Sequence, residues 1–492
     1  MTTADATSPP TTAGDLSNER DQSSARHVAR SASNLAVLRF VLMAQSAVTA
    51  ALITRILGPA TYGIYGAAIA TWMLLAAAAD FGFSLALSRD LPRHPTSHRA
   101  MLRAAYEVGL AWSLVLTLGM LALAVAAGLG TARGLVLLVL APSLITSGLS
   151  LSRAFFNATF RTRGVVLIDI SVGAVQSAAM VAAAAMDLGA TGVAAVVSAT
   201  TAVNTALVWW LSTRYVGPRT DAVYERMRFV RRAAPLGVLA IMTKVYLLID
   251  VVLVGWYVSG APVGEYAASA RLLTVLTGVA GIVTTAALPA FSARRADREG
   301  LDEVVARVWH WLVVTALPAF VGLGLFAPLA VTVLLGPDYD GAVPLVRILS
   351  LAGALMIVNN ILGTMMIATD ATRTLFIQNA VAIAVNVSGN IVLLPRYGVS
   401  AAAWLTVATE VLITVGALMA VGGRIGWRSL AATTARPAAA IAVAVAVALA
   451  LARWELAAAL VSSVTFVGVL SALRGWPDEF RRPFGRSRTT DG

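Results

Sequence analysis

The sequence contains no cysteine and only one lysine, Lys244, and just 13% of its 492 residues are charged. Without cysteine there is no disulfide, no thiolate metal site and no lipoprotein anchor. The four histidines, His27, His94, His98 and His310, do not form a buried cluster for metal binding or acid–base catalysis. A phosphate-binding loop that ends in lysine is excluded, because Lys244 lies within an apolar run. We therefore expect neither an ATPase nor an enzyme, and no cofactor or metal.

Hydrophobic residues make up 58% of the chain, and the mean hydropathy is +0.79. A chain this apolar is typical of an integral membrane protein, and apolar runs of about 20 residues predict membrane-spanning helices. An open sheet cannot satisfy its backbone in lipid, so the predicted fold is all-α with about 14 transmembrane helices. The predicted spans are 33–57, 63–87, 105–129, 134–157, 164–187, 190–212, 236–258, 264–290, 308–335, 343–368, 375–394, 398–421, 437–452 and 456–473.

The basic residues indicate the orientation of these spans. If the N-terminus is cytoplasmic, 28 of the 37 basic residues fall in inner segments and five fall within spans. The remaining four, in outer turns, are Arg55, Arg133, Arg396 and Arg453. Basic residues in short loops stay on the cytoplasmic side, so both termini are predicted inside. The net charge of +12 lies in loops and not along an aromatic-rich stripe, which argues against nucleic-acid binding.

Two pairs of outer hairpins resemble each other at a nearly constant spacing. Gly63, Tyr65 and Ala67 recur 201 residues later as Gly264, Tyr266 and Ala268, and Gly192, Val193 and Ala195 recur 206 residues later as Gly398, Val399 and Ala401. This spacing indicates a duplicated six-helix unit, as in many transporters, although small residues also recur by chance in such an alanine-rich chain. The predicted organisation is a disordered cytoplasmic tail (1–30), two six-helix lobes (31–232 and 233–430), helices 13 and 14 (431–474) and a cytoplasmic tail (475–492).

Ionisable residues within spans are costly in lipid, so they normally face a partner or a hydrated cavity. The candidate substrate-binding residues are Arg271, Arg39, Lys244, Arg153, Asn386 and Asn390. The candidate coupling residues are Asp250, Glu410 and Asp169, because a deeply buried acid can bind and release a proton. Structural interpretations stay open: snorkelling for Arg153 and Asp169, a helix cap for Asp80, mutual pairing for Lys244 and Asp250, and interhelical hydrogen bonds for the asparagines.

Five segments, in this order, resemble the polysaccharide transporter branch (Wzx-type O-antigen flippases) of the MOP superfamily. They are ITRILGPATYGIYGAA, ADFG, LLIDVVLVGWYVSGAPVGEYAASARLL, LGPDYDGAVPLVRILSLAG and LPRYGVSAAAW. The resemblance implies a fourteen-helix translocator in a bacterial cytoplasmic membrane. Its implied substrate is undecaprenyl-pyrophosphate-linked oligosaccharide, and its candidate protein partners are a polysaccharide polymerase and glycosyltransferases. Arg271, in the string YAASARL, matches a Tyr-Ala-x-x-x-Arg-Leu stretch of the superfamily and is our candidate pyrophosphate ligand.

The sequence fits other substrate classes and functions less well, with a non-transporting scaffold as the exception. Multidrug exporters of the superfamily have twelve helices, which argues against that substrate class. Lipid II flippases carry an Arg-Asp pair in the first helix, where this chain has Thr49 and Ala50. From other classes, a membrane-embedded polysaccharide polymerase would need a large outer loop that the sequence lacks, and a non-transporting scaffold stays open.

The asymmetry of basic residues predicts that reporter fusions placed after Arg232 and at the C-terminus both report the cytoplasm. Paired phosphatase and fluorescent-protein fusions measure this directly, because each reporter is active on one side of the membrane only. A C-terminus outside the cell would contradict the fourteen-helix count.

Overall fold

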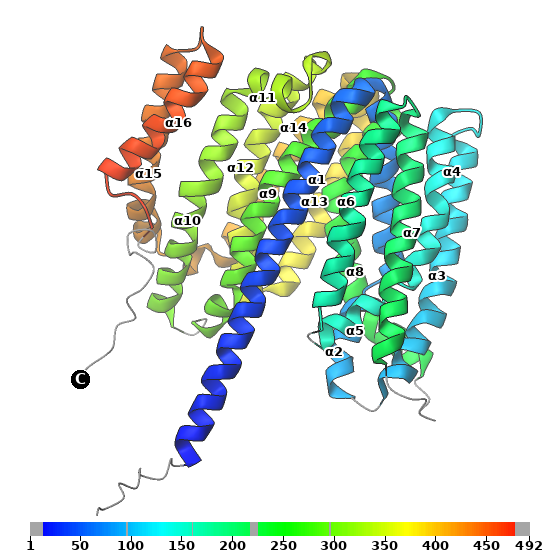
Figure 1. Cartoon of the computed structure of the whole chain (residues 1–492). Helices are drawn as coiled ribbons and strands as arrows, with labels where there is room; N and C mark the ends of the chain where they lie inside the picture. Colours follow the sequence, from blue (N-terminus) through cyan, green and yellow to red (C-terminus); the bar gives the residue numbers. More distant parts are fainter. Residues whose placement is uncertain (1–12, 95–96, 160, 217–224, 295–296, 478–492) are drawn as a thin grey trace, which may run out of the picture. The chain divides into compact units, whose positions relative to one another are not determined.

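The computed structural model describes residues 13–94, 97–159, 161–216, 225–294 and 297–477, and every regular element within these ranges is a helix (Figure 1). Among the described residues, 13–48 belong to one compact unit and those from Thr49 onward belong to the other. The disordered tail predicted over 1–30 is corrected for residues 13–30, which belong to the helix that begins at Ala13. No proline follows Pro10 until Pro59, so the backbone can stay helical here. Residues 1–12 lie outside the described ranges.

We call the part of the chain up to residue 232 the first lobe, and its described residues before residue 217 form nine helical segments. They are α1 (Ala13–Asp80), α2 (Phe83–Asp90), η1 (Leu91–Arg93), α3 (His98–Ala126), α4 (Ala132–Ile145), η3 (Thr146–Gly148), α5 (Ser152–Ala158), α6 (Arg163–Ala185) and α7 (Gly189–Tyr215). Helix α1 is broken at Gly58, whose φ of 69° is followed by Pro59. Proline has no N–H for the helical ladder, so this pair ends one membrane crossing and begins the next.

The rest of the described chain, which contains the second lobe and the C-terminal helix pair, is also helical. They comprise α8 (Arg226–Tyr257), α9 (Ala261–Ala293), α10 (Arg298–Leu325), α11 (Ala327–Leu334), η4 (Pro337–Tyr339), α12 (Ala342–Ala368), α13 (Thr372–Tyr397), α14 (Val399–Val421), η5 (Gly422–Arg424), α15 (Trp427–Ala450) and α16 (Glu455–Ala472). The split predicted near Asp187 is confirmed, because α6 ends and α7 begins there. The thirteenth span, predicted at 437–452, starts earlier, at Trp427.

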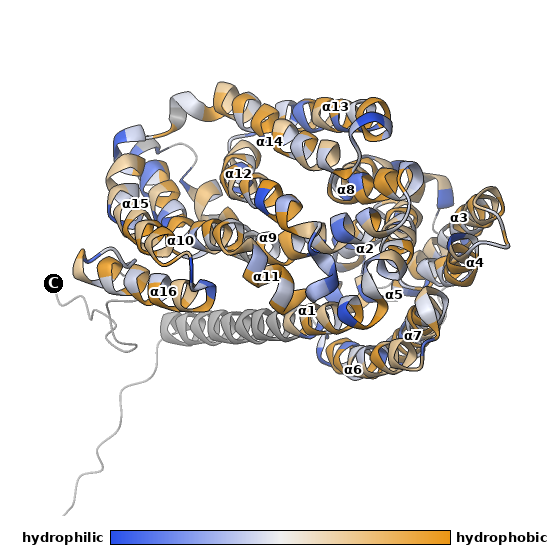
Figure 2. Ribbon diagram, turned by 90° about the horizontal axis from the view of Figure 1, so that it is seen from above, coloured by the Kyte–Doolittle hydropathy of each residue, from blue (hydrophilic) through white to orange (hydrophobic). Residues whose placement is uncertain are grey.

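The helix count agrees with the prediction. Among the described residues, eleven helices are long and apolar enough to cross a membrane, and the bent pair formed by 132–148 and 152–158 makes a twelfth. The break at Gly58 divides the 50-residue span Ala44–Arg93 into two crossings, and the 33-residue α9 supplies the fourteenth. Peripheral helices such as α6 and α7 carry exposed large apolar residues, among them Leu167, Val175 and Val203. Much of their ribbon has the hydrophobic colour in Figure 2, as expected for helices that contact lipid.

Glycines bring the two lobes into direct backbone contact. A Cβ added to Gly264 in α9 would lie 1.8 Å from the carbonyl oxygen of Pro59, and one added to Gly63 would lie 2.7 Å from the Gly264 nitrogen. The two glycines that the sequence repeat pairs thus touch each other. We call the contact of Gly63, Gly66 and Ala67 with Gly255, Gly264 and Ala267 the interlobe seam.

Helix α8 contacts both lobes. Its first turns join the core of the first lobe, where the ring of Phe229 stacks on Phe83 at 5.2 Å and Arg232 pairs with the buried Asp90 at 3.2 Å. Its later turns pack against α13 and α14. The boundary predicted between residues 232 and 233 therefore falls within a continuous helix, whose first turns contact the first lobe.

Candidate functional site

Asp250, in the second half of α8, lies at the centre of a polar cluster within the second lobe. Its carboxylate accepts hydrogen bonds from the Thr406 hydroxyl of α14 at 2.9 Å and from the Asn390 amide of α13 at 3.3 Å. The Tyr266 hydroxyl of α9 donates a longer bond of 3.4 Å. Asn390 also donates to the side-chain oxygen of Asn386, one turn away, at 3.0 Å. The structure thus brings together one predicted coupling residue and two predicted substrate ligands.

Glu410, in α14, is fully buried and has its own set of donors. The Tyr246 hydroxyl donates to one carboxylate oxygen, and the Asn359 amide of α12 donates to the other at 2.7 Å. The Thr414 hydroxyl in turn donates to the Asn359 side-chain oxygen at 2.8 Å and fixes the amide orientation. Each partner is neutral, so the hydrogen bonds stabilise the carboxylate without cancelling its charge.

The two acids form reciprocal pairs between α8 and α14. On α8, Tyr246 lies one turn before Asp250, and on α14, Thr406 lies one turn before Glu410. Tyr246 of α8 donates to Glu410 of α14, and Thr406 of α14 donates to Asp250 of α8. Both hydrogen bonds join α8 to α14, so a movement of α8 along α14 would break both of them. The two acids would then lose these donors together.

Both acids line one small cavity, of about 40 Å³. The described residues around it include no lysine, arginine or histidine, and the side-chain oxygen of Asn390 nearby is buried without a hydrogen-bond partner. A cavity of this size holds a few water molecules or a small cation and excludes a sugar. Unpaired carboxylates in an apolar bundle are costly unless a proton or a cation neutralises them. Two carboxylates thus line a cavity whose described lining carries no basic side chain.

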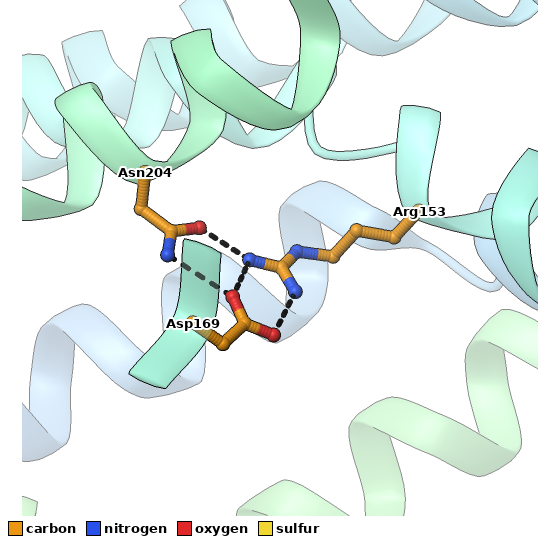
Figure 3. A network of polar contacts seen from close by, with 3 residues as sticks. All are labelled: Arg153, Asp169 and Asn204. Atoms are coloured by element: carbon orange, nitrogen blue, oxygen red, sulfur yellow. Dashed lines mark hydrogen bonds and ion pairs between the residues drawn. The ribbon is translucent and has the colours of Figure 1, made fainter. Parts of the chain in front are cut away.

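Arg153 and Asp169 are joined in the first lobe (Figure 3). The Arg153 guanidinium forms two parallel bonds of 2.8 Å to the Asp169 carboxylate. Asn204 of α7 accepts a bond from Arg153 and donates one of 3.0 Å to Asp169. Both charged side chains are partly exposed, at 35% and 26%. The snorkelling interpretation does not describe this arrangement, since the guanidinium is turned toward its partner and its charge is already balanced.

Arg271 lies in α9, close to the interlobe seam. Its positive charge acts on the hydroxyls of Tyr62 and Tyr65, two buried residues of α1 in the opposite lobe. The carboxylate of Glu265, earlier in α9, lies against the backbone of Gly341. Arg271 is not among the described residues that line the small cavity, although its neighbour Ala270 is.

The remaining predicted residues are not brought to these clusters. Lys244 is exposed on α8, and among the described residues no hydrogen bond or ion pair to its ammonium group is found, including none from Asp250. Arg39 lies in the first unit, and its side chain is outside the described residues. Asp80 accepts bonds from the backbone N–H and the hydroxyl of Ser84, so it caps the turn before α2.

Four site residues escaped the sequence analysis: Asn204, Tyr246, Tyr266 and Asn359. Each has a signal that could have revealed it. Asn204 and Asn359 are amides in the middle of apolar helices, and Tyr246 lies four residues from Asp250, hence on the same helix face. In the sequence, Tyr266 stands out only as part of the repeated hairpin.

A family described as polysaccharide biosynthesis protein matches residues 52–344, more than half of the chain. The chain belongs to this family. The teichuronic acid biosynthesis protein TuaB of Bacillus subtilis (strain 168) is 25% identical over 121 residues, which is 24% of this chain and 25% of that relative. The present member of the polysaccharide biosynthesis family therefore matches only a quarter of that relative's length.

Solved structures show the fold of this family member. Lipid II flippase MurJ in an inward closed conformation superposes with a TM-score of 0.71 at 13% identity, over 91% of this chain and 99% of that chain. An inward-facing multidrug resistance MATE family transporter of the MOP superfamily gives 0.58 at 13% identity, over 79% and 98%. The chain therefore has the fold of these transporters, and its apolar helices make it a multi-pass membrane protein.

The ion pair of Arg153 and Asp169 should contribute to the stability of the folded protein. Arg153→Ala leaves the Asp169 carboxylate without its cation, so we expect the free energy of unfolding to fall by about 1–3 kcal/mol, less than for a fully buried pair because both groups are partly exposed. Arg153→Met combined with Asp169→Leu should recover most of this loss. Thermal unfolding of the detergent-purified protein measures both. Equal destabilisation by the single and the double variant would contradict a structural ion pair.

Proposed function

We propose that the protein moves a polyprenyl-pyrophosphate-linked oligosaccharide from the inner to the outer leaflet of a bacterial cytoplasmic membrane, for surface-polysaccharide synthesis. The observation that carries this proposal is the match of residues 52–344 to polysaccharide biosynthesis proteins in a chain with a MOP transporter fold. The relation to a teichuronic acid biosynthesis protein supports a glycan in place of a drug. Two lobes that meet at a glycine-lined seam support alternating access.

The proposed pathway places the pyrophosphate at Arg271. A guanidinium offers a planar fork of donors that suits a diphosphate, and the electrostatic influence of Arg271 on Tyr62 and Tyr65 of α1 supports a position facing the first lobe. Arg153 is a weaker candidate, because Asp169 already balances its charge. Asn386 and Asn390 serve the cation cavity in this proposal and do not contact the glycan.

Arg271→Ala should lower the flipping rate by roughly 10- to 100-fold, the range expected for the loss of hydrogen bonds to a charged group. Arg271→Lys keeps the charge without the fork and should retain part of the rate. The measurement uses proteoliposomes with a fluorescent undecaprenyl-pyrophosphate-linked oligosaccharide, in which quenching from outside reports the leaflet. Lipid II and a cationic dye, tested in parallel, measure the competing substrate classes.

A control variant and a second substitution separate binding from structure. Arg347→Ala removes another arginine of the membrane region, from α12, and should leave the rate unchanged. Recovery of flipping when Arg271→Ala is combined with Glu265→Gln would mean that Arg271 only balances an acid. That result would overturn its role as a pyrophosphate ligand.

The proposed energy source is a cation gradient acting on Asp250 and Glu410. Asp250→Asn and Glu410→Gln keep the shape of each side chain and remove its ability to bind a proton or cation. We expect each variant to lose most of the acceleration that a proton or sodium gradient gives to flipping, while Asp187→Asn, in the outer turn before α7, behaves as wild type. The two gradients are imposed separately on the same proteoliposomes. Full gradient dependence in both acid variants would exclude these residues as the coupling site.

A further inference from the structure

Two Leu-Gly-Pro turns, far apart in the sequence, lie against each other in the structure. Leu57-Gly58-Pro59 ends the first part of α1, and Leu335-Gly336-Pro337 follows α11. Both glycines have positive φ, 69° at Gly58 and 116° at Gly336. A Cβ added to Gly336 would lie 3.3 Å from the Cγ of Arg55, so the second turn packs on the arginine that precedes the first.

Arg55 caps the end of α11. Its guanidinium donates to the carbonyl of Thr332 at 3.1 Å and to that of Val333. The last carbonyls of a helix have no donor within that helix and carry the negative end of its dipole, so a guanidinium there is favourable. Arg55 comes from the first lobe and α11 from the second, and the bond therefore joins the lobes.

Tyr339 makes the converse contact. It lies just after the second turn, is only 1% exposed, and its hydroxyl donates to the carbonyl of Thr54 at 3.0 Å. Thr54 lies in the last turn of α1 before the break at Gly58. Each turn thus supplies a side chain that caps the helix leading into the other turn.

We propose that Arg55 and Tyr339, with the carbonyls of Thr54, Thr332 and Val333, form a clasp that holds the outer ends of the two lobes together and opens to release the transported molecule. The assignment to the outer face rests on the orientation used in the proposed function. In the first lobe, the clasp residues Thr54 and Arg55 precede the break at Gly58, and the interlobe seam begins after this break, at Gly63. The clasp therefore lies next to the outer end of the seam. Separation of the lobes at this face cannot proceed without breaking both of its contacts.

The absence of cysteine gives a clean test. Ala267→Cys places a single thiol in the seam, where the wild-type side chain is only 6% exposed and faces Gly66. In this background, Tyr339→Phe and Arg55→Gln should each raise the labelling rate by a membrane-impermeant maleimide added outside the cell about threefold to tenfold, the effect of losing one or two hydrogen bonds. Tyr397→Phe and Arg396→Gln, exposed at the outer end of α13, are the matched controls and should leave the rate unchanged.

Unchanged labelling in the double variant Arg55→Gln/Tyr339→Phe would overturn the clasp, and so would acceleration only by reagent added to inside-out vesicles. Labelling needs no glycan, so a failure to flip oligosaccharide leaves this result standing and counts against the proposed function alone.

A disulfide provides a second readout that does not depend on an open state being stable. The Cβ of Arg55 would lie 3.9 Å from a Cβ at position 336, within the range for a disulfide. The test uses a chain that carries Arg55→Cys, Gly336→Cys and Ala267→Cys. Once the thiols at positions 55 and 336 have been oxidised to a disulfide, labelling of the thiol at position 267 from outside should be suppressed. Gly336→Cys alone measures the strain of a side chain at φ 116°. Labelling that persists in the oxidised protein would contradict the clasp.

Discussion

The central constraint on this protein is the presence of two carboxylates, Asp250 and Glu410, around one small cavity whose described lining contains no basic side chain. Neutral hydroxyls and amides from five other positions hold the two acids in place but leave their charge uncompensated. In the proposed function, a small cation or a proton neutralises the two carboxylates, and its release leaves them uncompensated. The preference for the bound or the empty state would then depend on how α8 lies against α14.

Helix α8 connects that constraint with the rest of the molecule. Its first turns are fixed to the first lobe by the stacking of Phe229 on Phe83 and by the ion pair of Arg232 with Asp90, whereas its later turns carry Asp250. In the proposed function, a change at the cation cavity would reach the contact between the lobes through this single continuous helix. The glycine seam is compatible with such movement, because backbone surfaces without side chains separate without disturbing interlocked packing.

Much of the fold follows from the sequence, because apolar run length and the distribution of arginine depend on the bilayer and not on tertiary contacts. The predicted spans, the break near Asp187 and the acids at Asp250 and Glu410 rest on such local signals. The partners of those acids could not be predicted, since the pairing of Glu410 with Tyr246 joins residues 164 positions apart. The same reason hid the capping of α11 by Arg55, which the sequence shows only as one basic residue in an outer turn.

Cation binding to the small cavity can be measured without a transport assay. Calorimetric titration of the detergent-purified protein with sodium at fixed pH measures sodium binding. Potentiometry of the same protein measures proton uptake. We expect saturable binding of sodium or protons that is weakened at least about tenfold in Asp250→Asn and lost in Asp250→Asn/Glu410→Gln, whereas Asp187→Asn binds like the wild type. Identical binding curves for the wild type and the double variant would contradict this expectation.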